Sequence, residues 1–175
     1  MNKLFSKIAT LSVGLGLAVG MGVVLGSQKE AKVVRADDST ATLQITSGVT
    51  SDGNLTDDNS KTWALSADAA GWTSHANYIH VGSGSKTAKS ISLESSGYSD
   101  VTIKEVHVWA AAKASSGVTT KISIDGNLLG TSPELGNTAE SGGTEYYVTN
   151  TNSYSGTINV EISRESSTKA AIYFN

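Results

Sequence analysis

The sequence has no cysteine and a single proline, Pro133, among its 175 residues. Without cysteine there is no disulfide bond to stabilise an exported domain and no thiol to act as a nucleophile. Sustained helical periodicity is missing as well, because no segment from Thr40 onward repeats apolar residues with the period of a helix. These absences exclude a disulfide-stapled scaffold and a helical bundle, so stability must come from the core of another kind of domain.

Charge of either sign is absent from residues 8–25, an apolar run of 18 residues that follows two lysines. A polar stretch and Val34-Arg35-Ala36, a small-residue cleavage pattern, come after it. Residues 1–36 are therefore predicted to be a signal peptide, and residues 37–175 the mature domain. Because a run of 18 residues is near the shortest that spans a bilayer, a retained N-terminal membrane anchor is the alternative. Either fate places the domain outside the cytoplasm, as a secreted or cell-surface protein.

Positive charge is scarce in the predicted mature domain. Five of the 13 basic residues and one of the 16 acidic residues precede residue 37, which leaves 8 bases, 15 acids and a formal net charge of −7. Binding to nucleic acid or to anionic lipid needs clustered cations. We therefore expect no nucleic-acid partner and no membrane association after cleavage. The remaining 139 residues suffice for one core and not for two.

What the mature part does contain is serine and threonine, 41 of its 139 residues, and a recurring alternation of apolar and polar positions. Both features suit short, partly exposed strands. The alternation predicts nine strands, at residues 43–45, 63–65, 78–81, 91–93, 101–110, 122–124, 146–148, 158–162 and 172–174. Nine strands separated by glycine-containing turns predict an all-β fold with a single antiparallel β-sandwich. We expect Trp63, Ile158, Val160 and Ile162 in its core.

The longest predicted strand, residues 101–110, changes the parity of its apolar positions halfway along. A β-bulge at Lys104-Glu105 would add one residue and keep the apolar side chains on both sides of it facing the core. Glu105, His107 and Trp109 would then share the opposite face of the strand.

The order of motifs along the chain carries a family resemblance. The motifs are Thr62-Trp63, Tyr78-Ile79-His80-Val81-Gly82, Ile91-Ser92-Leu93, Val101-Thr102-Ile103-Lys104-Glu105-Val106, Lys121-Ile122-Ser123-Ile124-Asp125-Gly126-Asn127, Gly156-Thr157-Ile158-Asn159-Val160-Glu161-Ile162 and Ala171-Ile172-Tyr173-Phe174. From about residue 41 to residue 175 this order resembles the galactose-binding-like β-sandwich accessory modules of exported Gram-positive bacterial proteins. The resemblance implies a jelly-roll fold and carbohydrate binding. The binding residues of such modules lie in variable loops, so none is carried over.

In such modules a further strand usually follows the position of Ile172-Tyr173-Phe174. Here the sequence given stops at Asn175, directly after that alternating stretch. The expectation is a domain that lacks its last strand, or one whose final strand ends flush.

Aromatic residues give the sharpest indication of function. Sugar rings present apolar C–H faces that stack on indoles, while carboxylates and imidazoles bond their hydroxyl groups. Trp109 beside His107 and Glu105, with Trp72 in a separate loop, supplies these groups. These four residues are the predicted ligand-binding set. The alternative is that Trp109 caps the edge of the sandwich and Trp72 folds over the core.

An acidic loop over residues 52–59 offers side-chain oxygens for a cation. Calcium takes six to eight oxygen ligands, and Asp52, Asn54, Asp57 and Asp58 supply several. The loop departs from the helix-loop-helix calcium pattern, because Asp57 stands at the position of the turn glycine. A structural calcium ion is the one cofactor considered, and a solvated turn cluster is the alternative.

Together these features predict an exported, non-catalytic module that binds glycan or cell-wall polysaccharide. A structural or adhesive surface domain without a small ligand is the second hypothesis. A glycoside hydrolase is the third, disfavoured because the acids lie mostly in exposed turns, where no pKa shift is expected. An exposed Trp109 would favour the first hypothesis, a buried one the second, and a deep cleft with paired acids the third.

Overall fold

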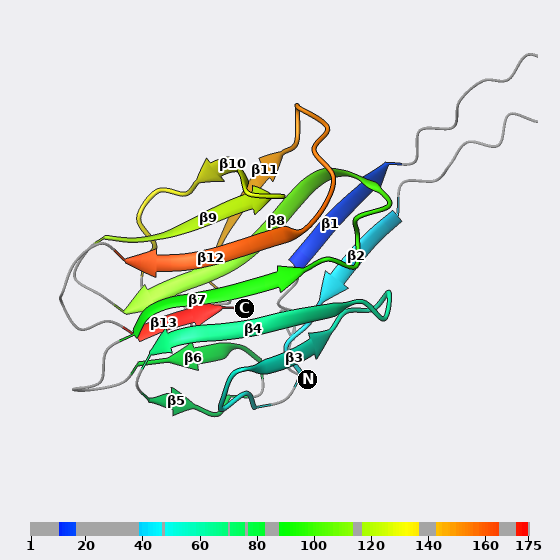
Figure 1. The fold of residues 1–175 in the computed structure, drawn as a ribbon. Coiled ribbons are helices and arrows are strands. Elements are labelled where there is room, and N and C mark those ends of the chain that lie inside the picture. The colour runs from blue at the N-terminus through cyan, green and yellow to red at the C-terminus, as the bar shows by residue number, and fades with distance from the viewer. Residues whose placement is uncertain are drawn as a thin grey trace, which may run out of the picture.

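The computed structural model describes residues 11–16, 39–46, 48–69, 71–75, 77–82, 88–113, 117–136, 143–164 and 171–174. Within these residues every regular element is a strand, and every strand pairing is antiparallel (Figure 1). The prediction of an antiparallel all-β chain is confirmed. No helix that could cross a membrane occurs in the described part of the chain.

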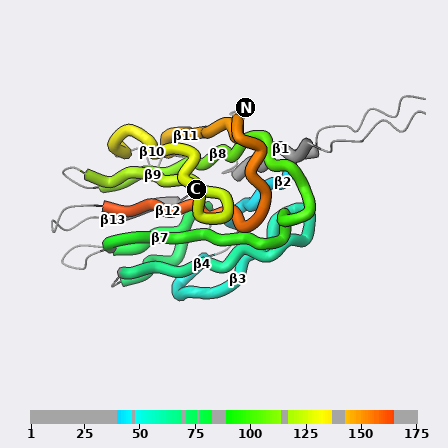
Figure 2. Tube along the Cα trace, turned by 45° about the horizontal axis from the view of Figure 1, so that its top comes forward, coloured from blue at the N-terminus to red at the C-terminus, as the bar shows by residue number. Residues whose placement is uncertain are grey.

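The strands form two sheets. The first has the order β2 (Ser39–Leu43), β1 (Leu11–Gly16), β8 (Thr102–Lys113), β13 (Ala171–Phe174), β6 (Ile79–Val81) and β5 (Trp72–Thr73), with β11 (Thr144–Thr149) also paired to β8. The second has the order β10 (Asn127–Thr131), β9 (Val118–Ile124), β12 (Ile158–Arg164), β7 (Ala88–Ser95), β4 (Thr62–Ala69) and β3 (Gly53–Thr56). Figure 2 shows β9, β12, β7, β4 and β3 following one another in this order.

One hydrophobic cluster joins residues of both sheets. Alternate residues of β12 and β9 in the second sheet, and of β8 in the first, are buried in it. Ile158, Val160 and Ile162 are fully buried, and Trp63 is 1% exposed, so the four predicted core residues are confirmed. Burying an aliphatic side chain of this size stabilises the fold by about 1.5–3 kcal/mol, which fits a domain without disulfide bonds.

All nine predicted strands overlap strands of the structure, namely β2, β4, β6, β7, β8, β9, β11, β12 and β13, although the first, at residues 43–45, shares only Leu43 with β2. Four strands were not predicted. Of these, β3 and β5 are short edge strands without an apolar alternation, and β10 has the adjacent Leu128 and Leu129. The turn before β10 contains Asp125 and Gly126, which both have positive φ, as a type I′ hairpin turn requires.

The fourth unpredicted strand, β1, comes from the predicted leader. Its residues pair with β2 on one side and with β8 on the other. The cleavage pattern at Val34-Arg35-Ala36 lies outside the described residues, so processing after Ala36 stays a prediction.

Candidate ligand-binding face

The predicted bulge in β8 is confirmed. Gly14 of β1 is opposite Glu105 and Leu15 is opposite Ile103, so Lys104 is the extra residue on β8. Ile103 and Val106 are both fully buried although their numbers differ in parity. The bulge therefore lets both halves of β8 face the core.

A buried asparagine holds this bulge in place. The backbone N–H of Asn150 donates to the carbonyl of Lys104 at 2.7 Å, and its side-chain amide donates to the carbonyl of Ile103 at 2.9 Å. The same side chain also binds the backbone of Tyr154, donating to its carbonyl and accepting from its N–H. Asn150 thus satisfies backbone groups that an irregular ladder leaves without strand partners.

Beyond the bulge, Glu105, His107 and Trp109 are partly exposed, while Val106 and Val108 between them are buried. The three predicted residues therefore lie on the face of the first sheet that points away from the core. Trp109 is neither buried between the sheets nor fully exposed.

Strand β11 completes this face with two residues that sequence reasoning missed. In the β11–β8 ladder, Tyr147 is directly opposite His107, and Glu145 is directly opposite Trp109. Tyr147 is one of the two exposed large hydrophobic residues in the described chain, at 57% exposure. We call Glu105, His107, Trp109, Glu145 and Tyr147 the β8–β11 patch.

His107 is the centre of the patch. Its Nδ1 lies 2.7 Å from Glu145 Oε1, and its Nε2 lies 3.2 Å from Glu105 Oε2. The imidazole is nearly parallel to the ring of Tyr147, with centroids 5.0 Å apart, and to the ring of Trp109, with centroids 6.2 Å apart. Two carboxylates and two aromatic rings therefore converge on one imidazole.

These contacts change the protonation of His107. Partial burial lowers the pKa of His107, but the hydrogen bonds and negative charges of Glu145 and Glu105 outweigh it, so its pKa lies above the ordinary 6.5. A pKa raised by folding stabilises the fold fully below the pKa of the unfolded chain. That contribution is lost as the pH rises through the higher folded pKa.

We therefore expect the stability difference between the wild type and His107→Gln to shrink as the pH rises from about 5.5 to about 8.5. Urea unfolding at several pH values measures it. A difference that is constant or grows with pH would show that the two carboxylates do not stabilise an imidazolium.

For the variant His80→Gln we expect the stability difference from the wild type to depend on pH in the opposite direction. Burial, then the nearby His75 and Lys113, lower the pKa of His80, against a hydrogen bond with Gly82 that raises it. Its neutral form is favoured in the fold, so its contribution is present above about pH 6.5 and is lost as the pH falls through the lowered folded pKa. The stability difference between the wild type and this variant should therefore grow with pH.

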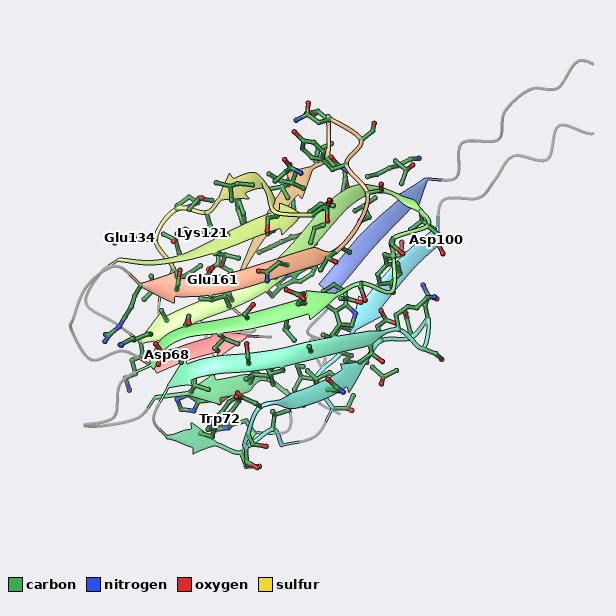
Figure 3. All side chains as sticks on the ribbon, in the orientation of Figure 1. Asp68, Trp72, Asp100, Lys121, Glu134 and Glu161 are labelled. Carbon is green, nitrogen blue, oxygen red and sulfur yellow. The ribbon has the colours of Figure 1, made fainter. Side chains whose placement is uncertain are left out.

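Trp72 is not brought to the patch. It lies in β5, which is separated from β8 by β6 and β13 in the sheet order (Figure 3). Its half-buried side chain packs against the hydrophobic cluster. Trp72 is therefore folded against the core, which was the alternative to a role in ligand binding.

Three of the four predicted calcium ligands have hydrogen-bond partners of their own. The side chain of Asp57 is buried and accepts hydrogen bonds from Trp63 Nε1, from the Tyr98 hydroxyl and from the backbone N–H groups of Asn59 and Lys61. Asp58 accepts from the N–H of Thr42 at 2.7 Å, and Asp52 accepts from the N–H of Ala67 at 2.9 Å. Asn54 is an exposed residue of β3.

These bonds give Asp57 a role in joining the β3–β4 turn to the core. Among the residues that the structure describes, no group of three His, Cys, Asp or Glu side chains is arranged to hold a metal ion. The calcium site stays a prediction, and the groups around Asp57 account for its burial without an ion.

Comparison with known proteins adds little to this geometry. No family model and no curated protein matches the chain. A solved structure that is similar to it contains the CBM51-2 and INT domains of ZmpB from Clostridium perfringens, at 15% identity. The match covers 77% of this chain but only 29% of the other, with a TM-score of 0.35. At this level of likeness, the function has to be argued from the β8–β11 patch.

Proposed function

We propose that this chain is an exported, non-catalytic carbohydrate-binding module of the galactose-binding-like jelly-roll type, which holds glycan on the β8–β11 patch. The observation that carries the proposal is the exposed Tyr147 and the partly exposed Trp109 beside two carboxylates on a sheet face. Glycan or cell-wall polysaccharide outside the cell is the ligand that this combination suits best.

Exposed aromatic residues on a strand need a reason. Leaving a large apolar side chain in water forgoes about 1.5–3 kcal/mol of burial. Tyr147 uses one ring face against His107 and is still 57% exposed. The C–H face of a pyranose can cover such a ring, while Glu105 and Glu145 accept hydrogen bonds from its hydroxyl groups.

The arrangement of the two acids supports binding over hydrolysis. In a glycoside hydrolase the two carboxyl groups flank the scissile bond, and the sugar lies between them. Here the imidazole of His107 lies between Glu105 and Glu145 and is hydrogen-bonded to both. A glycosidic bond therefore has no room between these acids.

Glycan retention should depend on the aromatic residues of the patch. Trp109→Ala and Tyr147→Ala are each expected to weaken glycan binding at least about tenfold, because central aromatic contacts dominate binding energy. Glu105→Gln and His107→Ala should weaken it less. A glycan array followed by calorimetry on the retained glycan measures these effects.

Leu128→Ala is the matched control, since Leu128 is 60% exposed but belongs to the second sheet. It should leave binding unchanged. Retention that survives both aromatic substitutions, or unfolding caused by Trp109→Ala, would remove the patch as the binding face. A surface domain without a small ligand would then be the better description.

A further inference from the structure

We infer that the β8–β11 patch selects glycans by charge, taking amino sugars whose amino group is protonated and rejecting glycans built from uronic acids. This inference rests on the proposed function and names its ligand class. It follows from the aromatic rings and carboxylates that line the patch and from the presence of a single basic residue among the five.

The aromatic rings of the patch favour a cation. The faces of Trp and Tyr rings carry negative potential and attract an ammonium group within about 6 Å. Tyr147 and Trp109 already lie nearly parallel to the imidazole of His107, at interplanar angles of 14° and 25°. The same two rings are therefore placed to contact a second positive group from the solvent side.

The negative charge of the patch also favours a positively charged ligand. Glu105 and Glu145 have side chains that are 46% and 44% exposed, and His107 is the one basic residue among the five. With His107 protonated the patch has one excess negative charge, and with His107 neutral it has two. Lys104 is the nearest cation along β8; it is exposed in the bulge, directly before Glu105, so Glu145, opposite Trp109, is the carboxylate of the patch that lies further from it along the strand.

An amino sugar matches both features at once. Its ring C–H groups can cover an aromatic face while its ammonium group donates to a carboxylate, and a charge-assisted bond of this kind is about twice as strong as one from a hydroxyl group. A uronic acid would instead bring a carboxylate against Glu105 and Glu145. Like charges at a binding face are a common device for excluding a competing ligand.

The test compares two trisaccharides that differ only in acetylation, tri-glucosamine and tri-N-acetylglucosamine, with a tri-uronate as the third probe. Binding to the full chain is measured by calorimetry or by NMR titration at low salt, at about pH 6, where the amino groups are protonated. Glu145→Gln removes one charge from the patch. Glu161→Gln removes the same charge from β12 in the second sheet, as its matched control (Figure 3).

We expect tri-glucosamine to bind about tenfold more tightly than the acetylated form, and the uronate not to bind. Glu145→Gln should abolish that preference, and Glu161→Gln should keep it. Equal loss in both variants would mean attraction by net charge alone and would overturn the assignment to this patch.

Failure of this inference can be told apart from failure of the proposed function. Tighter binding of the acetylated or the uronate probe, lost in Trp109→Ala, would overturn the charge selection and leave the glycan-binding face in place. The same holds if none of the three probes binds but another glycan is retained through Trp109. If no glycan is retained through Trp109 or Tyr147, the proposed function fails, and the charge selection with it.

Discussion

Replacing Asp57 with alanine is expected to lower the free energy of unfolding by about 3–5 kcal/mol. The carboxylate of Asp57 accepts from the indole N–H of Trp63 at 2.8 Å and from the Tyr98 hydroxyl, all within the buried interior. It also accepts from two backbone N–H groups of the β3–β4 turn. The alanine variant leaves these donors without their acceptor, and each buried donor left unsatisfied costs about 1–3 kcal/mol.

The environment of Tyr98 supports this view of the site. Burial, followed by the hydrogen bond to Asp57 and its negative charge, raises the pKa of the Tyr98 hydroxyl, so it remains a donor at all physiological pH values. The Tyr98 ring also lies 6.2 Å from that of Trp63. Asp57, Trp63 and Tyr98 therefore form one unit that joins the β3–β4 turn, β4 and the segment between β7 and β8.

Asp58→Ala is the control for this experiment, because Asp58 is exposed and accepts a single backbone bond from Thr42. It should cost no more than about 1 kcal/mol. Urea unfolding of both variants, with Tyr98→Phe and the double variant Asp57→Ala/Tyr98→Phe added, gives the coupling between the two side chains. Similar losses for Asp57→Ala and Asp58→Ala would contradict the role assigned to Asp57.

A chelator separates this role from calcium binding. If Asp57 stabilises the fold through its hydrogen bonds alone, EDTA leaves the unfolding midpoint of the wild type unchanged. A wild type that loses stability in EDTA, together with an Asp57→Ala variant that does not, would restore calcium as the reason for the buried carboxylate.

A second large effect is expected in the core. The double variant Ile158→Ala/Val160→Ala should lose about 4–7 kcal/mol, because both side chains are fully buried and their truncation leaves a cavity. A domain of this kind has about 5–15 kcal/mol of stability in total. We expect the variant to be largely unfolded near body temperature, as followed by circular dichroism during heating.

The same strand provides the matched control. Asn159 and Glu161 alternate with the two core residues on β12 and point away from the core. Replacing both with alanine should change stability by no more than about 1 kcal/mol. If the two double variants behave alike, the alternation along β12 does not define its buried face.

The strands that the sequence predicted are those whose apolar alternation is complete. In β12 and β9 every second residue is buried, so the sequence alternation alone indicates which residues face the core. The bulge in β8 was predictable for the same reason, because apolar residues on both sides of Lys104-Glu105 can share one face only if the strand gains a residue there. The edge strands β3, β5 and β10 lack such alternation and depend on neighbours for their pairing.

The candidate site was predictable only on one strand. Glu105, His107 and Trp109 follow from the parity of β8, whereas Glu145 is 38 residues away from its partner His107. Alternation in β11 indicates that Glu145 and Tyr147 point outward, but not which strand lies beside them. The burial of Asp57 was hidden for a similar reason, since its partner Tyr98 is 41 residues further along the chain.

In the structure, part of the predicted leader forms β1, and this pairing excludes its insertion into a membrane at the same time. Residues 11–16 cannot cross a bilayer and also pair with β2 and β8, because each segment can be in one environment at a time. Removal after Ala36 would free the ladder positions of β2 and of residues 102–107 of β8 for a different strand. We therefore expect amide hydrogen exchange in β2 and in residues 102–107 of β8 to differ between the full chain and a chain that begins at residue 37.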